Sequence, residues 1–236
     1  MTPDILAAIT RAREEKRPIV LATRLSDGAQ HLLPDPGQDK ALNEAAEAAL
    51  RDDKSATIQS DGTAWFLQAH NPPLRLIVVG AVHIAQALVP FASGCGFEVT
   101  VVDPRRSFAS DERFPNVTIR TDWPDEALDA LHPDARTAVV TLTHDPKLDD
   151  PALDRALRSN SFYIGSLGSR RTHAARLARL RELGHTDAAM ARIRGPVGLS
   201  LEAVTAPEIA LSIVAELVAA RRGSALADRA PARQAA

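Results

Sequence analysis

The amino-acid sequence predicts an α/β protein: a doubly wound parallel sheet that follows a small N-terminal α+β domain. Two observations support this prediction. Continuous apolar runs alternate with helical segments after residue 73, and two prolines at residues 72 and 73 separate them from a region with a different pattern. We expect domains at residues 1–72 and 73–222, followed by a disordered tail at residues 223–236.

The composition excludes several classes of protein. With 28 Lys and Arg against 30 Asp and Glu, the chain lacks the basic excess that is typical of nucleic-acid binding. No apolar run approaches the ~20 residues that a membrane span needs, and the first residues lack the pattern of a secretory signal, so we expect a cytoplasmic protein. The single cysteine, Cys95, excludes an internal disulfide and a multi-cysteine zinc site. Between Gly94 and Gly96, it is expected to be a small packing residue.

The first domain reads as a short α+β unit. Residues 2–4 combine a capping threonine, a proline and an early acid, which predicts the start of a helix. The apolar residues 19–22 predict a strand, and Asp39 begins a second helix. A hairpin is predicted at residues 57–67, because Asp-Gly supplies the positive φ of a tight turn. The sequence Asn-Pro-Pro at residues 71–73 then ends the unit.

The second domain begins with a strand at residues 76–79 that is apolar throughout. Further strands are predicted at residues 98–102, 117–119, 138–142 and 162–164, with helices at residues 84–92 and 172–183. A capping box at Thr205 and Glu208 begins a final helix. If the strand order is 3-2-1-4-5, strands one and four are neighbours, and their carboxyl ends form the crevice where such sheets bind ligands.

Residues 80–85 follow the first of these strands and match part of the dinucleotide fingerprint G-x-G-x-x-G/A. The first glycine and the final alanine are present, which predicts a Rossmann-like turn. Val82 replaces the middle glycine, and its branched side chain obstructs the usual approach of a pyrophosphate. Asp103 ends the second strand, where a ribose-binding acid belongs, and Arg105 is suited to a phosphate. The alternative is an ordinary β-α-β turn without a ligand.

Two further loops leave strands at the same edge. Residues 143–145 include a histidine and an aspartate that are expected to contact a ligand; a plain hydrogen-bonding role is the alternative. Residues 165–171 combine two glycines, two serines and two arginines at a helix start, which is typical of an anion cradle but also of a capped helix with basic surface residues. The sequence suggests no catalytic residue and no metal ligand. The expected cofactor-binding residues are Gly80, Val82, His83, Asp103, Arg105, Thr143, His144, Asp145, Gly165, Gly168, Ser169, Arg170 and Arg171.

Five stretches in the same order resemble the XdhC/CoxI family of accessory proteins for xanthine dehydrogenase and related molybdenum hydroxylases. They are LIVVGAVHIAQA at residues 76–87, VTVVDPRRSF at 99–108, TLTHDPKLDDPAL at 141–153, YIGSLGSRRTH at 163–173, and residues 193–213 with RGPVGL and TAPEIALSI. The resemblance implies a Rossmann-like domain that binds molybdenum cofactor (molybdopterin), or a nucleotide form of it. It also implies a chaperone that protects the cofactor and helps insert it into a xanthine dehydrogenase-type molybdoenzyme, rather than an enzyme.

One feature of the family is missing. Longer members carry a Gly-Gly-Cys motif in the N-terminal domain, and residues 1–73 of this chain contain no cysteine. The chain therefore resembles a shortened member that acts with a cysteine desulfurase or a second accessory protein, and a homodimer stays open. Two other functions also remain: an NAD(P)-dependent oxidoreductase that uses Asp103 for ribose, and an interaction domain with an empty crevice.

Overall fold

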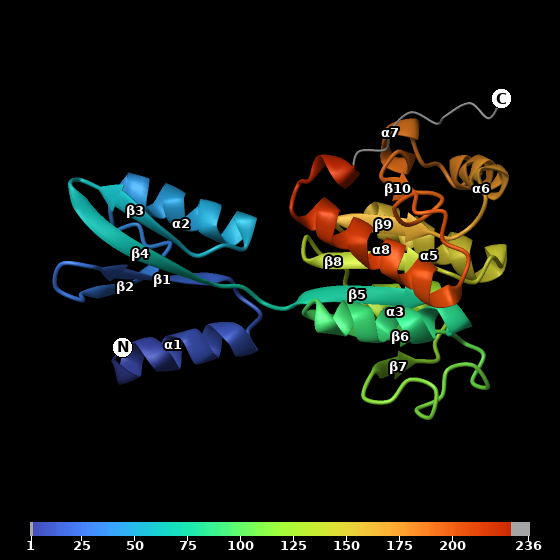
Figure 1. The fold of residues 1–236 in the computed structure, drawn as a ribbon, viewed down its shortest axis with the longest axis horizontal. Helices are drawn as coiled ribbons and strands as arrows, with labels where there is room; N and C mark the ends of the chain where they lie inside the picture. Colours follow the sequence, from blue (N-terminus) through green and yellow to red (C-terminus); the bar gives the residue numbers. More distant parts are fainter. Residues whose placement is uncertain (1, 228–236) are drawn as a thin grey trace. The chain divides into compact units, whose positions relative to one another are not determined.

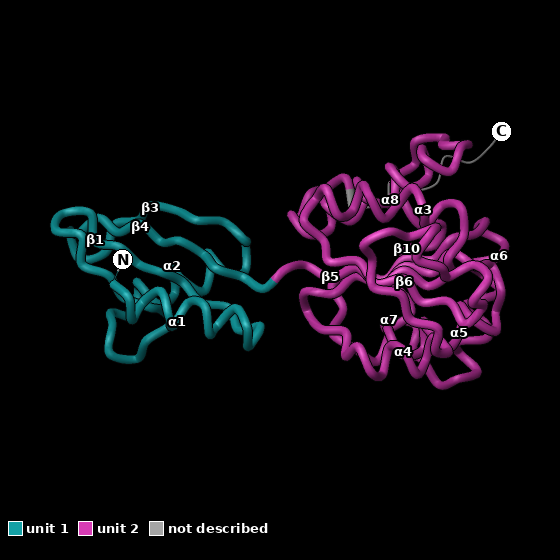
Figure 2. The backbone as a smooth tube through the Cα atoms, turned by 90° about the horizontal axis from the view of Figure 1, so that it is seen from below, with its two compact units in different colours: residues 1–72 teal, residues 73–236 magenta. Residues whose placement is uncertain are grey.

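Two separate sheets form in the computed structural model, which describes residues 2–227. The first sheet belongs to residues 1–72 and the second to the unit that begins at residue 73, as the two colours of Figure 2 show. Each unit has hydrophobic clusters of its own. The predicted class, an α/β protein with a small N-terminal α+β region, is confirmed.

The first unit is an antiparallel sheet of order β2-β1-β4-β3 with two helices. Asp39 caps the second helix as predicted, and its carboxylate accepts a hydrogen bond from Leu42 N–H. Asp61 and Gly62 turn the hairpin with φ of 49° and 70°. The core gathers around Leu67 and Trp65. The elements of this unit are α1 (Pro3–Glu14), β1 (Ile19–Arg24), β2 (Gln30–Leu33), α2 (Lys40–Asp52), β3 (Ala56–Ser60) and β4 (Thr63–His70).

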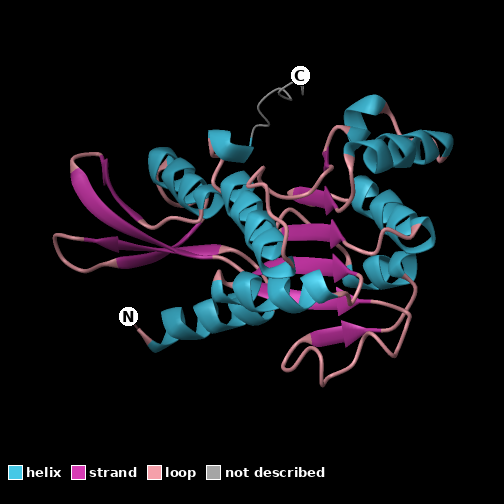
Figure 3. Ribbon diagram, turned by 45° about the vertical axis from the view of Figure 1, so that its right-hand side comes forward, coloured by secondary structure: helices cyan, strands magenta, loops and turns pink. Residues whose placement is uncertain are grey.

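The second unit is a parallel sheet of order β10-β9-β8-β5-β6-β7, in which the first strand of the unit lies between the second and the fourth, as predicted. Figures 1 and 3 show the strands side by side with helices on both faces. The strands are β5 (Leu74–Val79), β6 (Phe97–Val102), β7 (Thr118–Arg120), β8 (Thr137–Thr141), β9 (Tyr163–Ser166) and β10 (Ile193–Arg194). The helices are α3 (His83–Gly94), α4 (Pro124–Leu131), α5 (Pro146–Arg158), α6 (Arg170–Glu182), α7 (Asp187–Met190) and α8 (Ala206–Arg221).

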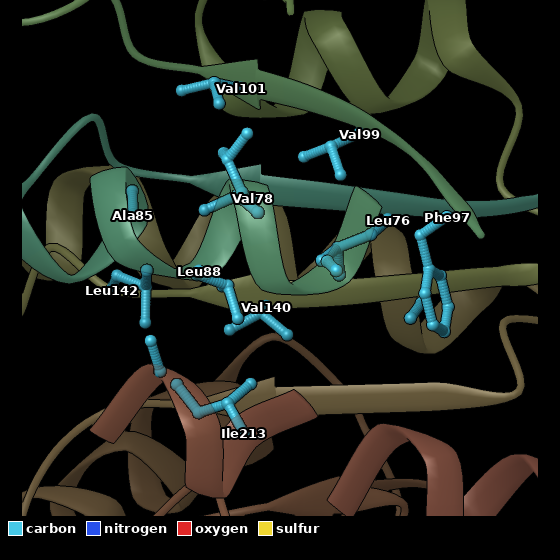
Figure 4. Packing of buried hydrophobic residues seen from close by; sticks show 14 of the residues in the cluster. Leu76, Val78, Ala85, Leu88, Phe97, Val99, Val101, Val140, Leu142 and Ile213 are labelled. Atoms are coloured by element: carbon cyan, nitrogen blue, oxygen red, sulfur yellow. The ribbon is translucent and has the colours of Figure 1, made fainter. Parts of the chain in front are cut away.

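Side chains of the parallel strands alternate between two cores. In β5, Leu76 and Val78 belong to the cluster that contains α3 and α8, whereas Ile77 and Val79 belong to the cluster that contains α4 and α5. Figure 4 shows the first of these clusters, including Ile213 of α8. Burial of each Leu, Ile or Val side chain contributes about 1.5–3 kcal/mol. The two cores therefore explain why residues 76–79 of β5 are apolar on both faces, and they stabilise the sheet whose edge carries the site.

The remaining predictions about the fold concern Cys95, the C-terminal residues and membrane spans. Cys95 is exposed at the C-terminal cap of α3, so the prediction that it is a small packing residue is wrong; the turn from Gly94 to Gly96 lies at the surface. Within the predicted tail, Ala225–Ala227 form a 3-10 turn, and residues 228–236 lie outside the described part of the chain. None of the helices described here is both long and apolar enough to cross a membrane.

Candidate ligand-binding site

The loops after β5, β6, β8 and β9 lie next to one another, because the hydrogen-bonded ladder of the sheet continues into them. Gly80 N–H donates to the carbonyl of Val102 at 2.8 Å, and Leu167 N–H donates to the carbonyl of Thr141 at 2.9 Å. All four loops leave the carboxyl ends of adjacent parallel strands. Open α/β sheets bind ligands at this edge, where the connections turn to opposite faces.

Gly80 brings the loop after β5 against the loop after β8. Its φ is +110°, and a Cβ at this position would lie 2.6 Å from Cγ2 of Thr143. A glycine is therefore required here, both for the backbone conformation and for the close approach. Val82 is the N-cap of α3 and provides no side-chain hydrogen bond to the first turn, while His83 is exposed. The first N–H groups of α3 thus lack a side-chain cap.

Asp103 is fully buried at the end of β6 and accepts four hydrogen bonds. They come from Ala81 N–H at 2.8 Å and from Arg105, whose backbone N–H, Nε and Nη2 lie at 3.0, 2.9 and 2.7 Å. Burial alone would raise the pKa of Asp103, but the hydrogen bonds from Arg105 and Ala81 outweigh it and hold the pKa below its ordinary value. Four donors fill the lone pairs of a carboxylate. Asp103 can therefore accept a ribose hydroxyl only if Arg105 moves.

The loop after β8 is built around a buried acid that the sequence analysis did not identify. Asp149, in the first turn of α5, accepts hydrogen bonds from Thr143 Oγ1 at 2.7 Å and from His144 N–H at 3.1 Å. Burial raises its pKa, and the hydrogen bond from Thr143 opposes that shift. His144 has a positive φ of 62°, and its side chain is exposed. Asp145 is exposed and caps α5 by accepting from Lys147 N–H.

The loop after β9 contains the predicted anion cradle. Gly165 is buried within the strand, where a Cβ would lie 2.5 Å from Cγ2 of Val197, so it serves close packing. Gly168 has a φ of +141°. Ser169 caps α6 by accepting a hydrogen bond from Thr172 N–H at 3.1 Å. The two arginines at residues 170 and 171 are exposed in the first turn of that helix, as an anion site requires.

A second unforeseen residue, Arg176 of α6, lies beneath these loops and is only 2% exposed. Its Nη2 donates to the carbonyl of Leu167 at 3.0 Å and lies 3.6 Å from Oδ2 of Asp149. Burial lowers the pKa of Arg176, and the charge of Asp149 opposes that shift. The sequence RRTHAARLARLRE is typical of a basic helix at the surface. Arg176 lies four residues from both Thr172 and Leu180, and this helical spacing is the only sequence signal that it faces inward.

The structure thus joins part of the predicted set into one network, in which Gly80 touches Thr143, Thr143 bonds to Asp149, and Arg176 connects Asp149 to Leu167. The exposed members of the set are His83, His144, Asp145, Ser169, Arg170 and Arg171. Within residues 2–227, no group of three or more His, Cys, Asp or Glu side chains could hold a metal ion. A cavity of about 190 Å³ lies at the amino end of β9, away from these loops.

Comparison with known proteins identifies a family model and several relatives. The family model described as the XdhC Rossmann domain matches residues 76–217. The molybdenum cofactor insertion chaperone PaoD of Escherichia coli (strain K12) is 34% identical over 163 residues, which cover 67% of this chain and 45% of PaoD. A probable xanthine dehydrogenase subunit of Bacillus subtilis (strain 168) is 32% identical over 161 residues, 68% of this chain and 47% of that protein.

A solved structure extends the similarity to most of the chain. A crystal structure described as a xanthine dehydrogenase from Bacillus halodurans matches with a TM-score of 0.71 and 25% identity, over 93% of this chain and 64% of that chain. The chain spans less than half the length of either curated relative. These findings confirm the resemblance seen in the sequence motifs: the chain belongs to the XdhC family, and residues 76–217 match its Rossmann domain.

Proposed function

We propose that this chain binds molybdenum cofactor in the cytoplasm, protects it and passes it to a xanthine dehydrogenase-type molybdoenzyme. The observation that carries the proposal is the convergence of the loops after β5, β8 and β9 at one edge of a sheet that belongs to the XdhC family. The relative PaoD is named as a molybdenum cofactor insertion chaperone, and the relative from Bacillus subtilis is named as part of a probable xanthine dehydrogenase.

The residues present fit a phosphorylated pterin. The first turn of α3 has no side-chain cap, so no side chain occupies its N–H groups. Backbone N–H groups at a helix N-terminus bind phosphate well, because the helix dipole adds to their hydrogen bonds. Arg170 and Arg171 are exposed at the start of α6 and would add positive charge. His144 and Asp145, also exposed, would contact the organic part.

The proposed role is binding and handover. The cofactor supplies its molybdenum chemistry in the enzyme that receives it, and the residues of this chain hold it until then. Cys95, the single cysteine, lies at the C-terminal end of α3, opposite the end that carries the candidate site. We therefore include a cysteine desulfurase or a second accessory protein as the partner that handles sulfur.

The structure does not favour an NAD(P)-dependent oxidoreductase. That function needs Asp103 as an acceptor for ribose, but its carboxylate is occupied by Arg105 and Ala81. The dinucleotide fingerprint of such enzymes also has a glycine at the position of Val82. Two features of the usual dinucleotide site are thus altered in the same place.

Anaerobic purification tests the proposed function. The protein is produced in a host that makes molybdenum cofactor and in a matched host that cannot make it. We expect molybdenum, measured by mass spectrometry, and pterin, measured by the fluorescence of its oxidation product, in equal amounts from the first host only. Molybdenum without pterin, or neither from the first host, would contradict the proposal.

A further inference from the structure

Arg176 connects two loops that are far apart in the sequence. Its Nη2 donates to the carbonyl of Leu167, directly before Gly168, and lies 3.6 Å from Asp149. Asp149 in turn holds Thr143 through its N–H and Oγ1, and His144 through its N–H. One guanidinium therefore fixes the backbone of the loop after β9 relative to the loop after β8.

Stability alone does not account for a charged pair at this place. The side chains of Arg176 and Asp149 are 2% and 1% exposed. Replacing a buried ion pair by apolar residues of similar volume is often neutral or stabilising, because both charges must leave water. In addition, Nε and Nη1 of Arg176 are buried and have no hydrogen-bond partner among the described residues. A buried donor left unsatisfied opposes folding, so its presence in a native protein calls for an explanation other than stability.

We propose that Arg176 is a positioning residue, which holds the loops after β8 and β9 at the spacing that cofactor binding requires. This inference rests on the proposed function, since it concerns the same site. Arg176 itself is buried beneath Gly168, so it acts through Leu167 and Asp149. A single atom, Nη2, donates to the carbonyl of Leu167 and faces the carboxylate of Asp149.

The test compares Arg176→Met with a control arginine at the other end of the sheet. Arg192 donates to the carbonyls of Leu157, Ser159 and Ser161, near the amino end of β9, so Arg192→Met removes a comparable backbone bridge away from the site. Hydrogen exchange by mass spectrometry is followed in segments 142–149 and 165–170, and cofactor content per protein is measured after anaerobic purification.

In Arg176→Met we expect faster exchange in both segments and a loss of cofactor of roughly tenfold, the effect typical of residues that orient ligand-binding groups. Arg176→Lys keeps the charge beside Asp149, so we expect it to restore part of the exchange protection and part of the cofactor content. Arg192→Met should keep wild-type cofactor content. Unchanged exchange in segment 142–149, or an equal loss of cofactor in Arg192→Met, would overturn the inference.

A double variant keeps the test valid if Arg176→Met does not fold. Asp149→Asn combined with Arg176→Met removes both buried charges, and wild-type protein is the reference. We expect the double variant to hold less cofactor than wild type and to exchange faster in segments 142–149 and 165–170; wild-type cofactor content would overturn the inference. Wild-type protein without any cofactor would instead contradict the proposed function, and the exchange of segment 142–149 would still decide whether Arg176 couples the loops.

Discussion

The carboxylate of Asp103 is buried without being neutral, because Arg105 and Ala81 provide four hydrogen bonds. In Asp103→Asn, an amide NH₂ would face donors, and Arg105 would lose its partner. We expect a loss of about 2–4 kcal/mol in the free energy of unfolding, measured by urea denaturation.

The matched control is Asp122→Asn. Asp122 accepts from Arg120 at the same spacing of two residues, but both side chains are partly exposed. Removing that pair should cost less than about 1 kcal/mol. Equal losses in the two variants would show that burial does not strengthen the Asp103–Arg105 pair.

The same pair makes stability depend on pH. The folded-state pKa of Asp103 lies below the ordinary value of 3.8. Its contribution is therefore fully present above about pH 4 and is lost as the pH falls through the folded-state value. We expect wild-type protein to lose more stability than Asp103→Asn as the pH falls below about 4. Urea denaturation at a series of pH values measures this difference, and parallel curves would contradict it.

Gly80 tests the close approach of two loops. In Gly80→Ala, the new Cβ would meet Thr143 in a conformation with positive φ, so we expect a loss of about 1–3 kcal/mol in stability. Gly94→Ala, within α3 and with no heavy atom inside 4 Å of the added Cβ, should be neutral or stabilising by up to about 1 kcal/mol. Thermal unfolding of both variants provides the comparison, and a stable Gly80→Ala would contradict the geometry described.

At the scale of elements, apolar patterns predicted the central strands well. β8 and most of β5 are buried on both faces, so their apolar runs identify them, whereas β6 is recognised by its valines although Glu98 is exposed. β2 was not predicted, because residues 30–33 are half polar and lie beside a single neighbour, β1. β10 is only two residues long and owes its assignment to pairing with β9. Tertiary contacts, and not local pattern, define such edges.

For the candidate site, the sequence predicted the loops but not the buried charged residues that hold them. Glycines and polar residues that follow strands identified all four loops, because parallel strands bring their carboxyl ends to one edge. Asp149 and Arg176 were missed, since a charged residue in a helix normally lies in solvent, and only their mutual contact allows burial. The hydrogen bonds from Arg105 to Asp103 were not predicted either, because closeness in the sequence does not show that two side chains are in contact.

The first turn of α6 provides a test at this scale. Arg170 and Arg171 are exposed, so replacing both by alanine should leave the thermal midpoint within about 2 °C of wild type while cofactor content falls. Arg181→Ala, at the C-terminal end of the same helix, is the control and should retain cofactor. Wild-type cofactor content in the double variant would remove these arginines from the proposed cradle.

At the scale of the whole molecule, the two units have separate cores, so damage to one should leave the other intact. Leu67 is fully buried in the first unit. We expect Leu67→Ala to destabilise that unit by about 2–5 kcal/mol. Denaturant unfolding, followed by hydrogen exchange of segments from each unit, separates the two responses. Cofactor content should be unchanged. A loss of cofactor that follows the unfolding of the first unit would place binding residues in that unit.

The most direct measurement is a crystal structure of the protein loaded anaerobically with molybdenum cofactor. The account predicts the cofactor at the loops after β5, β8 and β9, with its phosphate at the first turn of α3 or α6. Cofactor bound against residues 1–72, or in the cavity at the amino end of β9, would contradict it.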